Sequence, residues 1–401
     1  MKVLLADALP DAAVEQLEAA GDEVTRLPEL NADTLPDAVA GHEVLVVRST
    51  KVTAAALEAA DKLGLIVRAG AGTNNIDRDR AAELGIFVCN VPGKNALAVA
   101  ELTMGLLIAV DRHIAAGTAD LRAGTWNKKA YSKADGLFGR QMGIIGVGDI
   151  GIAAAARAWA FGIDVVAVAK PGRSHAAVAR AEAAGIRWVD DLDELLATSD
   201  IVSLHVPGAP DTKGMVDADF LAKMKDDAIL LNTSRGDVVD EAALIDAMDS
   251  RGIRAGLDVF ADEPGSGTAE FDSALAKHPS VVATHHVGAS TEQAQNAVTD
   301  GTLEAIDAYR TGSPINCVNL NPVPTRAATL TVRHHDRVGV LASILQALRK
   351  EQLNVSNMQN RVFAGSKAAV ASIDVGHLPT QALIDEVISL DDVIYVSVTP
   401  A

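Results

Sequence analysis

Short apolar runs alternate with helical stretches through the first 318 residues of the chain. Such runs, bounded by turn residues, are typical of strands in a parallel sheet, because both faces of that sheet are covered. The pattern predicts strands at 2–6, 43–47, 65–69 and 86–90, and again at 143–147, 164–168, 201–205, 229–232, 255–259 and 281–284. This alternation indicates two successive α/β domains, each built on a doubly wound parallel sheet.

Two helical stretches stand out in this part of the chain. Residues 11–20 place Ala13, Val14 and Leu17 on one apolar face. Residues 95–113 are apolar on nearly all sides, so we expect a helix that is buried between the two domains and joins them.

The pattern changes beyond a turn-rich stretch at 319–326, which we interpret as a linker. The residues after it predict a strand at 328–332, a helix at 339–350, strands at 354–360 and 367–375, a helix at 380–389 and a strand at 393–398. The order βαββαβ is that of a small ferredoxin-like domain, here covering residues 327–401.

Three glycines, Gly146, Gly148 and Gly151, lie between the strand at 143–147 and an Ala-rich helical run. A Gly-x-Gly-x-x-Gly turn between strand and helix is typical of dinucleotide binding. The first glycine allows a tight turn, the second lets the backbone approach a pyrophosphate, and the third lets the helix pack on the strand. The alternative is a tight strand–helix turn that binds nothing.

Composition and charge argue against nucleic-acid-binding, membrane and secreted proteins. The net charge of −18 disfavours nonspecific nucleic-acid binding, and no apolar run is long enough for a membrane span. The N-terminus lacks the pattern of a signal peptide. The two cysteines, Cys89 and Cys317, have neither metal-binding nor disulfide-framework spacing. We expect a soluble cytoplasmic protein without metal or disulfide.

Candidate catalytic groups follow three strands of the second domain. They are Arg235, Glu263 and the adjacent pair His285 and His286. An arginine can clamp a carboxylate through two parallel hydrogen bonds, and a carboxylate can fix a histidine in one tautomer and raise its pKa. Their order after a nucleotide-binding turn favours hydride transfer over a purely structural role.

Two cations, Arg48 and Arg68, end strands of the first domain. Ligands of parallel sheets bind beyond the carboxyl ends of the strands, so these side chains suggest an anionic substrate. The alternative is that both are ordinary solvated arginines.

Several segments in this order and spacing resemble the D-isomer-specific 2-hydroxyacid dehydrogenases, and within them the branch that acts on D-3-phosphoglycerate. The segments are 68–77, 89–101, the glycine turn, 232–236, 261–264 and 286–291, and the resemblance covers the whole chain. It implies a substrate-binding domain made of residues 1–95 and 287–318, and a Rossmann domain made of residues 96–286. It also implies oxidation of D-3-phosphoglycerate to 3-phosphohydroxypyruvate, the first step of serine biosynthesis.

The resemblance also implies roles for single residues. Arg235 would bind the substrate carboxylate and keto oxygen, Glu263 would orient an imidazole, and His286 would exchange the hydroxyl proton. His286 stands two residues before Gly-Ala-Ser, where the family has its histidine, and His285 takes the position of a proline. Expected cofactor contacts are Gly146, Gly148, Asp149, Ile150, Gly151, Lys170, Arg173, Pro207, Thr233 and Asp258. Expected substrate contacts are Arg48, Lys51, Arg68, Gly70, Asn95 and Arg235.

One departure from the family concerns the cofactor. The acid that normally binds the adenosine ribose is replaced by Ala169, and Lys170, Arg173 and Ser174 follow it. Family resemblance indicates NAD, whereas the missing acid and the cationic loop would suit the 2′-phosphate of NADP. We expect NAD, with NADP as the alternative.

The C-terminal domain resembles an ACT domain. His334, Asp336 and Asn354 stand where serine-sensing members hold their effector, although Asp336 replaces a frequent asparagine. Serine control or simple dimerisation both fit, and the family implies a homodimer or homotetramer. Two other functions stay open: another D-2-hydroxyacid dehydrogenase or glyoxylate/hydroxypyruvate reductase, and a non-catalytic cofactor-sensing binding protein.

Overall fold

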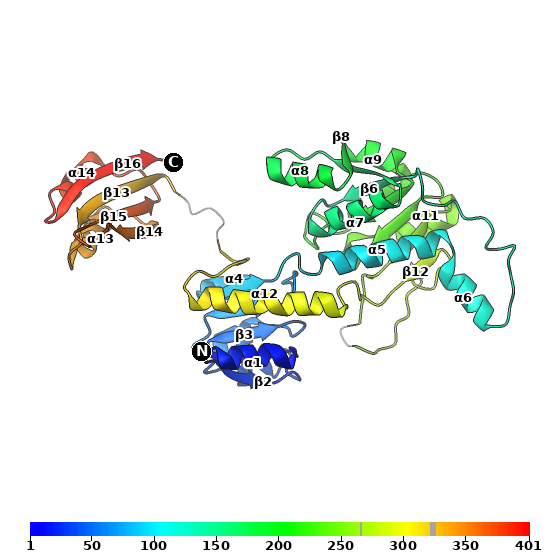
Figure 1. The fold of residues 1–401 in the computed structure, drawn as a ribbon, viewed down its shortest axis with the longest axis horizontal. Helices are drawn as coiled ribbons and strands as arrows, with labels where there is room; N and C mark the ends of the chain where they lie inside the picture. The colour runs from blue at the N-terminus through cyan, green and yellow to red at the C-terminus, as the bar shows by residue number, and fades with distance from the viewer. Residues whose placement is uncertain (265–266, 321–325) are drawn as a thin grey trace. The chain divides into compact units, whose positions relative to one another are not determined.

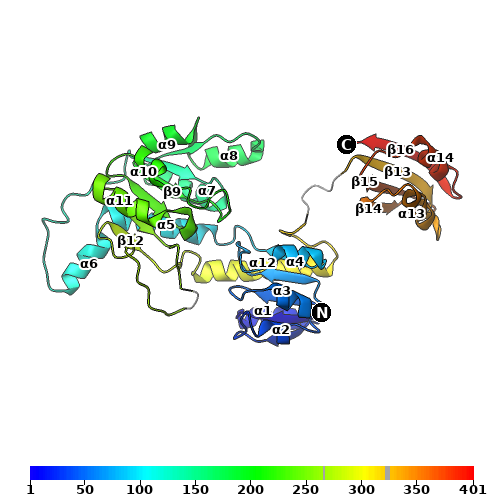
Figure 2. The same cartoon turned by 180° about the vertical axis from the view of Figure 1, so that it is seen from behind.

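A computed structural model describes residues 1–264, 267–320 and 326–401 (Figures 1 and 2). The chain divides into two compact units, Met1–Asn319 and Leu320–Ala401. The first contains two parallel sheets and the second one antiparallel sheet, so the predicted fold class is confirmed. Most of the predicted linker at 319–326 lies outside the described residues.

The first parallel sheet has the strand order β2-β1-β3-β4-β5. Its strands are β1 (Lys2–Leu5), β2 (Glu23–Arg26), β3 (Val44–Val47), β4 (Leu65–Arg68) and β5 (Phe87–Asn90). The helices among them are α1 (Asp11–Ala19), α2 (Leu35–Ala38), α3 (Ala54–Ala59) and α4 (Arg78–Glu83). The sequence pattern misses β2, because this edge strand is only partly buried and carries a charged residue at each end.

The second parallel sheet has the order β12-β11-β10-β9-β6-β7-β8, with seven strands where six were predicted. They are β6 (Gln141–Ile145), β7 (Asp164–Val168), β8 (Ile186–Val189), β9 (Ile201–Leu204), β10 (Ile229–Asn232), β11 (Arg254–Leu257) and β12 (Val281–Ala283). Helices α7 (Asp149–Ala160), α8 (His175–Ala183), α9 (Leu192–Thr198), α10 (Ala218–Lys223) and α11 (Glu241–Arg251) and the short 3₁₀ helix Gly236–Val238 connect them. The additional strand is again an edge strand, β8.

Three further helices complete the first unit. The long helix α5 (Ala96–Asp111) packs against α7, β10 and β11, and α6 (Ile114–Arg122) follows it. The helix α12 (Glu292–Arg310) returns to the first sheet and packs on β4, β5 and α1 (yellow in Figure 1). Most of α5 is buried, and Leu97 and Glu101 are exposed along one stripe of it.

The second unit confirms the βαββαβ prediction. Its strands are β13 (Ala328–His335), β14 (Val355–Val362), β15 (Ala368–Val375) and β16 (Val393–Pro400), and its helices are α13 (Val340–Lys350) and α14 (Gln381–Ile388). The antiparallel order is β14-β15-β13-β16. The core joins Leu330, Val332 and Ile373 of the sheet to Ile344 and Leu348 of α13. In the described parts of both units, no helix has the length and apolarity needed to cross a membrane.

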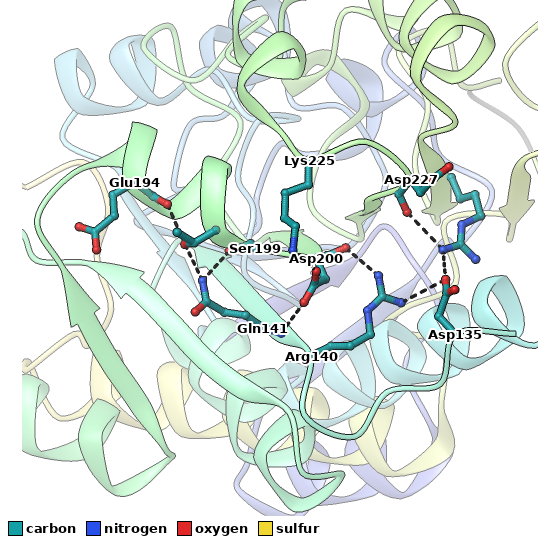
Figure 3. Close-up of polar contacts among 10 residues, drawn as sticks. Asp135, Arg140, Gln141, Glu194, Ser199, Asp200, Lys225 and Asp227 are labelled. Carbon is teal, nitrogen blue, oxygen red and sulfur yellow. Dashed lines mark hydrogen bonds and ion pairs between the residues drawn. The ribbon is translucent and has the colours of Figure 1, made fainter.

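A polar network fixes the amino-terminal edge of the second sheet (Figure 3). Asp200, which directly precedes β9, accepts the N–H of Gln141 at 2.9 Å and pairs with Lys225 at 2.5 Å. The Asp200 carbonyl oxygen also accepts a hydrogen bond from Arg140 at 3.3 Å. Burial would raise the pKa of Asp200, but these partners outweigh burial and lower it. The network ties β6, β9 and the approach to β10 together, at the edge opposite the glycine turn.

We expect Asp200→Asn to lower the free energy of unfolding at neutral pH by about 1–3 kcal/mol, because it weakens charge-assisted hydrogen bonds. The folded-state pKa lies below the unfolded value, so this contribution is present above about pH 4 and is lost as the pH falls through the folded pKa. Urea unfolding of both proteins at several pH values measures the difference. Asp193→Asn, which breaks an exposed pair with Lys223, is the control and should cost less than about 1 kcal/mol. An equal loss in both variants would contradict the assignment.

Candidate active site

The three glycines have the geometry that a dinucleotide turn requires. Gly146 has φ +102°, and a Cβ there would lie 2.4 Å from the carbonyl oxygen of His205. A Cβ on Gly151 would lie 2.1 Å from the carbonyl oxygen of Gly146, whereas a Cβ on Gly148 would meet nothing within 4 Å. Gly148 therefore opens onto free space at the amino-terminal end of α7. This open position and the free N–H groups beside it fit a pyrophosphate.

The loop after β7 carries the cationic side chains expected near the adenosine ribose. Ala169 and Lys170 are exposed. Arg173 donates from Nη1 to the carbonyl oxygen of Val147 at 3.2 Å, and its guanidinium carbon lies 5.4 Å from the Trp188 ring centre. The guanidinium is thus held at the rim of the glycine turn, with no acidic residue at position 169.

A cavity of about 420 Å³ runs from the glycine turn to the carboxyl end of the first sheet. Its lining includes residues expected to bind cofactor or substrate: Arg68, Asn95, Gly148, Asp149, Ile150, Pro207, Thr233, Arg235, Asp258 and His286. Both parallel sheets contribute to it. The fold thus brings the nucleotide turn, two of the predicted catalytic residues and one strand-end arginine to a single cavity.

His286 and Glu263 form a close pair beside this cavity. Nδ1 of His286 lies 2.6 Å from Oε2 of Glu263, and the other carboxylate oxygen accepts the N–H of Phe260 at 2.9 Å. The hydrogen bond to Glu263 raises the pKa of His286 and outweighs burial, which lowers it. Burial would raise the pKa of Glu263, but the bonds from His286 and Phe260 produce a net lowering. With Nδ1–H directed to the carboxylate, Nε2 is the atom that can accept a proton.

Asp258 holds the turn that presents His286. His286 has φ +53°, a left-handed conformation that costs a non-glycine residue about 1–2 kcal/mol. The Asp258 carboxylate accepts the N–H groups of Val287 at 2.9 Å and Gly288 at 2.8 Å, and the hydroxyl of Thr284 at 2.5 Å. The Asp258 carbonyl oxygen accepts the N–H of His286 at 2.7 Å. Asp258, an expected cofactor contact, thus also supports the histidine that is predicted to be catalytic.

Arg235 extends from a turn that Asn232 shapes. The Asn232 side chain accepts from the N–H and the hydroxyl of Ser234 at 3.0 and 2.7 Å, and donates to the Arg235 carbonyl oxygen at 2.9 Å. The arginine passes close to Gly208 and Gly72, where a Cβ would lie 3.0 and 2.7 Å from its atoms. Its guanidinium therefore reaches across to the glycine-rich loop that follows Arg68.

Arg68 and Arg48 add positive charge at the first sheet. The pKa of Arg68 is lowered to about 10, first by burial and then by the charges of Arg235 and Arg48. Within the described residues, its buried Nε has no hydrogen-bond partner. Gly70 leaves room for its guanidinium, since a Cβ there would lie 1.6 Å from Nη1. The three arginine side chains repel one another, and within the described residues Arg68 has a buried N–H without an acceptor. A bound anion would relieve both and stabilise the site.

The structure separates some predicted residues from this cluster. Lys51 is exposed and outside the cavity lining. Thr233 does line the cavity, but its hydroxyl lies 2.9 Å from that of Thr103 on α5. His285 lines a neighbouring cavity of about 640 Å³ that also contains Phe260 and Phe271. Only His286 of the two histidines lines the cavity that holds Arg235 and Gly148.

Sequence reasoning missed residues that position others. Asp7 accepts the backbone N–H groups of Arg48, Ser49 and Thr50 through one carboxylate oxygen. His205 also lines the cavity, and burial lowers its pKa to about 4, so it stays neutral beside the reacting groups. Its position at a strand end was the one available signal.

The three predicted effector residues do not gather within the second unit. His334 is buried and its Nε2 lies 3.1 Å from Oδ1 of Asn360. Asp336 lies next to Lys367, at the start of β15, whereas Asn354 bonds Gly376 beyond its end. The antiparallel register therefore puts Asp336 and Asn354 at opposite ends of the sheet.

The raised pKa of His286 gives a prediction for the pH dependence. In the oxidation predicted from the sequence, the neutral imidazole of His286 is the base, so the rate should rise with pH through a value above about 6.5. Glu263→Gln should move this inflection down by roughly one unit and lower kcat about 10–100-fold. Glu241→Gln is the matched control, because Glu241 accepts the N–H of Ala261 in the same loop region. An inflection that stays in place in Glu263→Gln would refute the pairing as its cause.

The chain is similar in sequence and fold to known proteins. The family model for the NAD binding domain of D-isomer specific 2-hydroxyacid dehydrogenases matches residues 104–288. The chain is 39% identical over 327 residues to a D-3-phosphoglycerate dehydrogenase of Methanocaldococcus jannaschii, covering 81% of this chain and 60% of that one. It is 44% identical over 281 residues to a hydroxypyruvate reductase of Thermotoga maritima, covering 69% and 88%. The TT0316 protein of Thermus thermophilus superimposes with a TM-score of 0.70 at 33% identity, covering 79% of this chain and all of that one.

Proposed function

Because this chain belongs to the D-isomer specific 2-hydroxyacid dehydrogenase family, we propose that it oxidises D-3-phosphoglycerate to 3-phosphohydroxypyruvate with a nicotinamide cofactor, the first step of serine biosynthesis. The observation that carries the substrate is a group of three arginines. Arg68 and Arg235 line the cavity, and Arg48 lies near enough to Arg68 for its charge to lower the Arg68 pKa. A phosphorylated three-carbon acid has two anionic ends, and one arginine cannot neutralise both.

Each residue of the site has a separate role in the proposed reaction. Arg235 binds the C1 carboxylate and stabilises the C2 oxygen as it becomes a carbonyl. His286, held by Glu263, takes the C2 hydroxyl proton on Nε2. The cofactor supplies the acceptor for the hydride that leaves C2. Arg68 and Arg48 bind the phosphate and so hold C2 in place.

A panel of initial rates tests this proposal. The oxidation arm compares D-3-phosphoglycerate with D-glycerate and D-lactate, and the reduction arm compares 3-phosphohydroxypyruvate with hydroxypyruvate and glyoxylate. We expect kcat/KM for each phosphorylated acid to exceed its plain analogue at least about tenfold, or about 1.4 kcal/mol. Absence of turnover in both arms would favour a non-catalytic cofactor-sensing protein.

A hydroxypyruvate or glyoxylate reductase is the second candidate. It is supported by the 44% identity to the hydroxypyruvate reductase of Thermotoga maritima. The matched segment spans only 60% of the Methanocaldococcus enzyme, which leaves a large part of that enzyme without a counterpart. Equal kcat/KM for hydroxypyruvate and its phosphorylated form would select this candidate.

For the cofactor we propose NAD, with NADP also accepted. The NAD-binding family model supports the first part, and the absence of an acid at Ala169 supports the second. An acid at that position would bind the ribose diol of NAD and repel a 2′-phosphate. The exposed Lys170 and the fixed Arg173 add no repulsion for either cofactor.

We expect Ala169→Asp to raise the ratio of kcat/KM for NAD over that for NADP by about 10–100-fold. The new carboxylate gains a charge-assisted hydrogen bond with one cofactor and repels the other. Ala169 is exposed and its N–H bonds the Val189 carbonyl oxygen through the backbone alone, so the fold should tolerate the change. Ala169→Asn has the same size without the charge and should shift the ratio far less. Equal shifts in both variants would contradict the electrostatic explanation.

We also propose a homo-oligomeric cytoplasmic enzyme whose C-terminal unit binds serine or pairs with a second copy. The buried His334 and its partner Asn360 are the polar pair in that unit which could respond to an effector. Inhibition of phosphoglycerate oxidation by serine, lost in His334→Ala, would support the first role.

A further inference from the structure

The only two cysteines of the chain lie side by side although 228 residues separate them. Cys89 is in β5, and Cys317 lies in the segment that follows α12. Both are free thiols, and their Sγ atoms are 3.0 Å apart. Neither lines the two cavities described above. The reaction proposed for the cavity therefore does not use them.

The backbone register at this pair suits a covalent link. The N–H of Asn90 donates to the Asn316 carbonyl oxygen at 3.2 Å, and the N–H of Val318 donates to that of Val88 at 2.8 Å. These bonds flank Cys89 and Cys317, which makes them a non-hydrogen-bonded pair of an antiparallel bridge. In such a pair the Cα atoms are about 4.5 Å apart and side chains are closest. That separation is within the range of about 4.4–6.8 Å found for disulfides.

We propose that Cys89 and Cys317 form a site of reversible oxidative modification, which closes to an intramolecular disulfide and fastens the segment leaving the first unit to β5. Hydrogen peroxide oxidises the Cys317 thiol to a sulfenic acid and is reduced to water. The Cys89 sulfur then attacks the Cys317 sulfur; the S–S bond forms, the S–O bond breaks, and the hydroxyl leaves as a second water with the Cys89 proton. Two electrons pass from the two thiols to the peroxide. An added dithiol reduces the disulfide back to the two thiols and is itself oxidised to a disulfide.

Different exposure assigns different roles to the two thiols. Cys89 is fully buried, whereas Cys317 is partly exposed and meets the oxidant first. Burial raises the pKa of the Cys89 thiol, and the contact with Cys317 raises it further, so Cys89 is a poor target for peroxide itself. Cys89 therefore acts as the thiol that resolves the sulfenic acid next to it.

The disulfide would reinforce a contact that is already specific. The Asn319 side chain accepts the N–H of Val88 at 2.9 Å and donates to the Ile86 carbonyl oxygen at 2.8 Å. These hydrogen bonds hold residues 316–319 against β5, but they are lost whenever the segment separates from the strand. A disulfide would keep the two together. A covalent link that closes a loop this long also restricts the unfolded chain strongly. Oxidation should therefore stabilise the first unit.

Full-length protein, reduced and then treated with hydrogen peroxide, tests the proposal. We expect an intact-mass loss of two hydrogens, a Cys89–Cys317 peptide under non-reducing conditions, and a melting temperature higher by roughly 5 °C or more. Dithiothreitol should reverse all three changes. Cys89→Ser and Cys317→Ser are the controls; both should keep activity and show no rise after peroxide.

Two results would overturn the proposal. One is peroxide-treated protein that carries only sulfinic or sulfonic acid on Cys317, or only disulfides between chains. The other is an internal disulfide without a rise in melting temperature relative to the two serine variants, which would show that the segment is not fastened by it. Each control replaces one sulfur atom by oxygen. Its melting temperature before peroxide is added shows whether it is folded, separately from the loss of the disulfide.

Discussion

His286→Gln is expected to lower kcat for oxidation by about 10²–10⁴-fold, while His285→Gln keeps kcat near that of the unmodified chain. The difference comes from where the two rings lie. His286 bonds Glu263 through Nδ1 at 2.6 Å. Both histidines border the neighbouring cavity, but His286 also lines the cavity with Arg235 and Gly148, and His285 does not. Glutamine can still bond Glu263 but cannot take a proton at the position of Nε2.

Steady-state kinetics with D-3-phosphoglycerate measure this pair of variants, and cofactor binding followed by fluorescence is the accompanying control. Both variants should bind the cofactor with similar affinity, because the His286 ring bonds Glu263 and His285 lies in the lining of the neighbouring cavity. A large loss of kcat in His285→Gln with an active His286→Gln would reverse the assignment. Equal losses in both would point instead to damage of the turn that Asp258 supports.

The sequence predicts the central strands well because these strands are buried on both faces. β3, β9 and β10 are buried along their whole length, and each stands out as an uninterrupted or nearly uninterrupted apolar run. The two missed strands, β2 and β8, are sheet edges with half-exposed polar residues. Their position depends on pairing with β1 and β7, which no local pattern records.

In the site, residues placed by the sheet topology were predicted, whereas contacts that depend on the path of a loop were not. Arg68 and Arg235 were predicted because topology alone brings the carboxyl ends of parallel strands together. Asp258 was expected to contact the cofactor, yet three of its hydrogen bonds go to residues 284–288, a contact that depends on the exact path of that loop. The proximity of Cys89 to Cys317 is equally invisible in the sequence, since it arises when the chain returns along α12.

Arg235→Gln is expected to lower kcat/KM by about 10³-fold or more. The change removes the bidentate carboxylate contact and the charge that stabilises the forming carbonyl, and one such donor alone contributes about 10²–10³-fold in other enzymes. Arg235→Lys keeps the charge without the fork and should lose less. Arg187→Gln, at the exposed edge strand β8, is the control and should be silent.

The pH profile separates this role from a merely structural one. The charge of Arg235 lowers the pKa of His286, in opposition to Glu263, which raises it. Residual activity in Arg235→Gln should therefore show its inflection at higher pH, the opposite of the shift expected for Glu263→Gln. A loss of activity without this alkaline shift would mean that the arginine acts at a distance from the imidazole and does not share its cavity. The two opposite shifts together would require Arg235, His286 and Glu263 to act on one substrate as a single electrostatic unit.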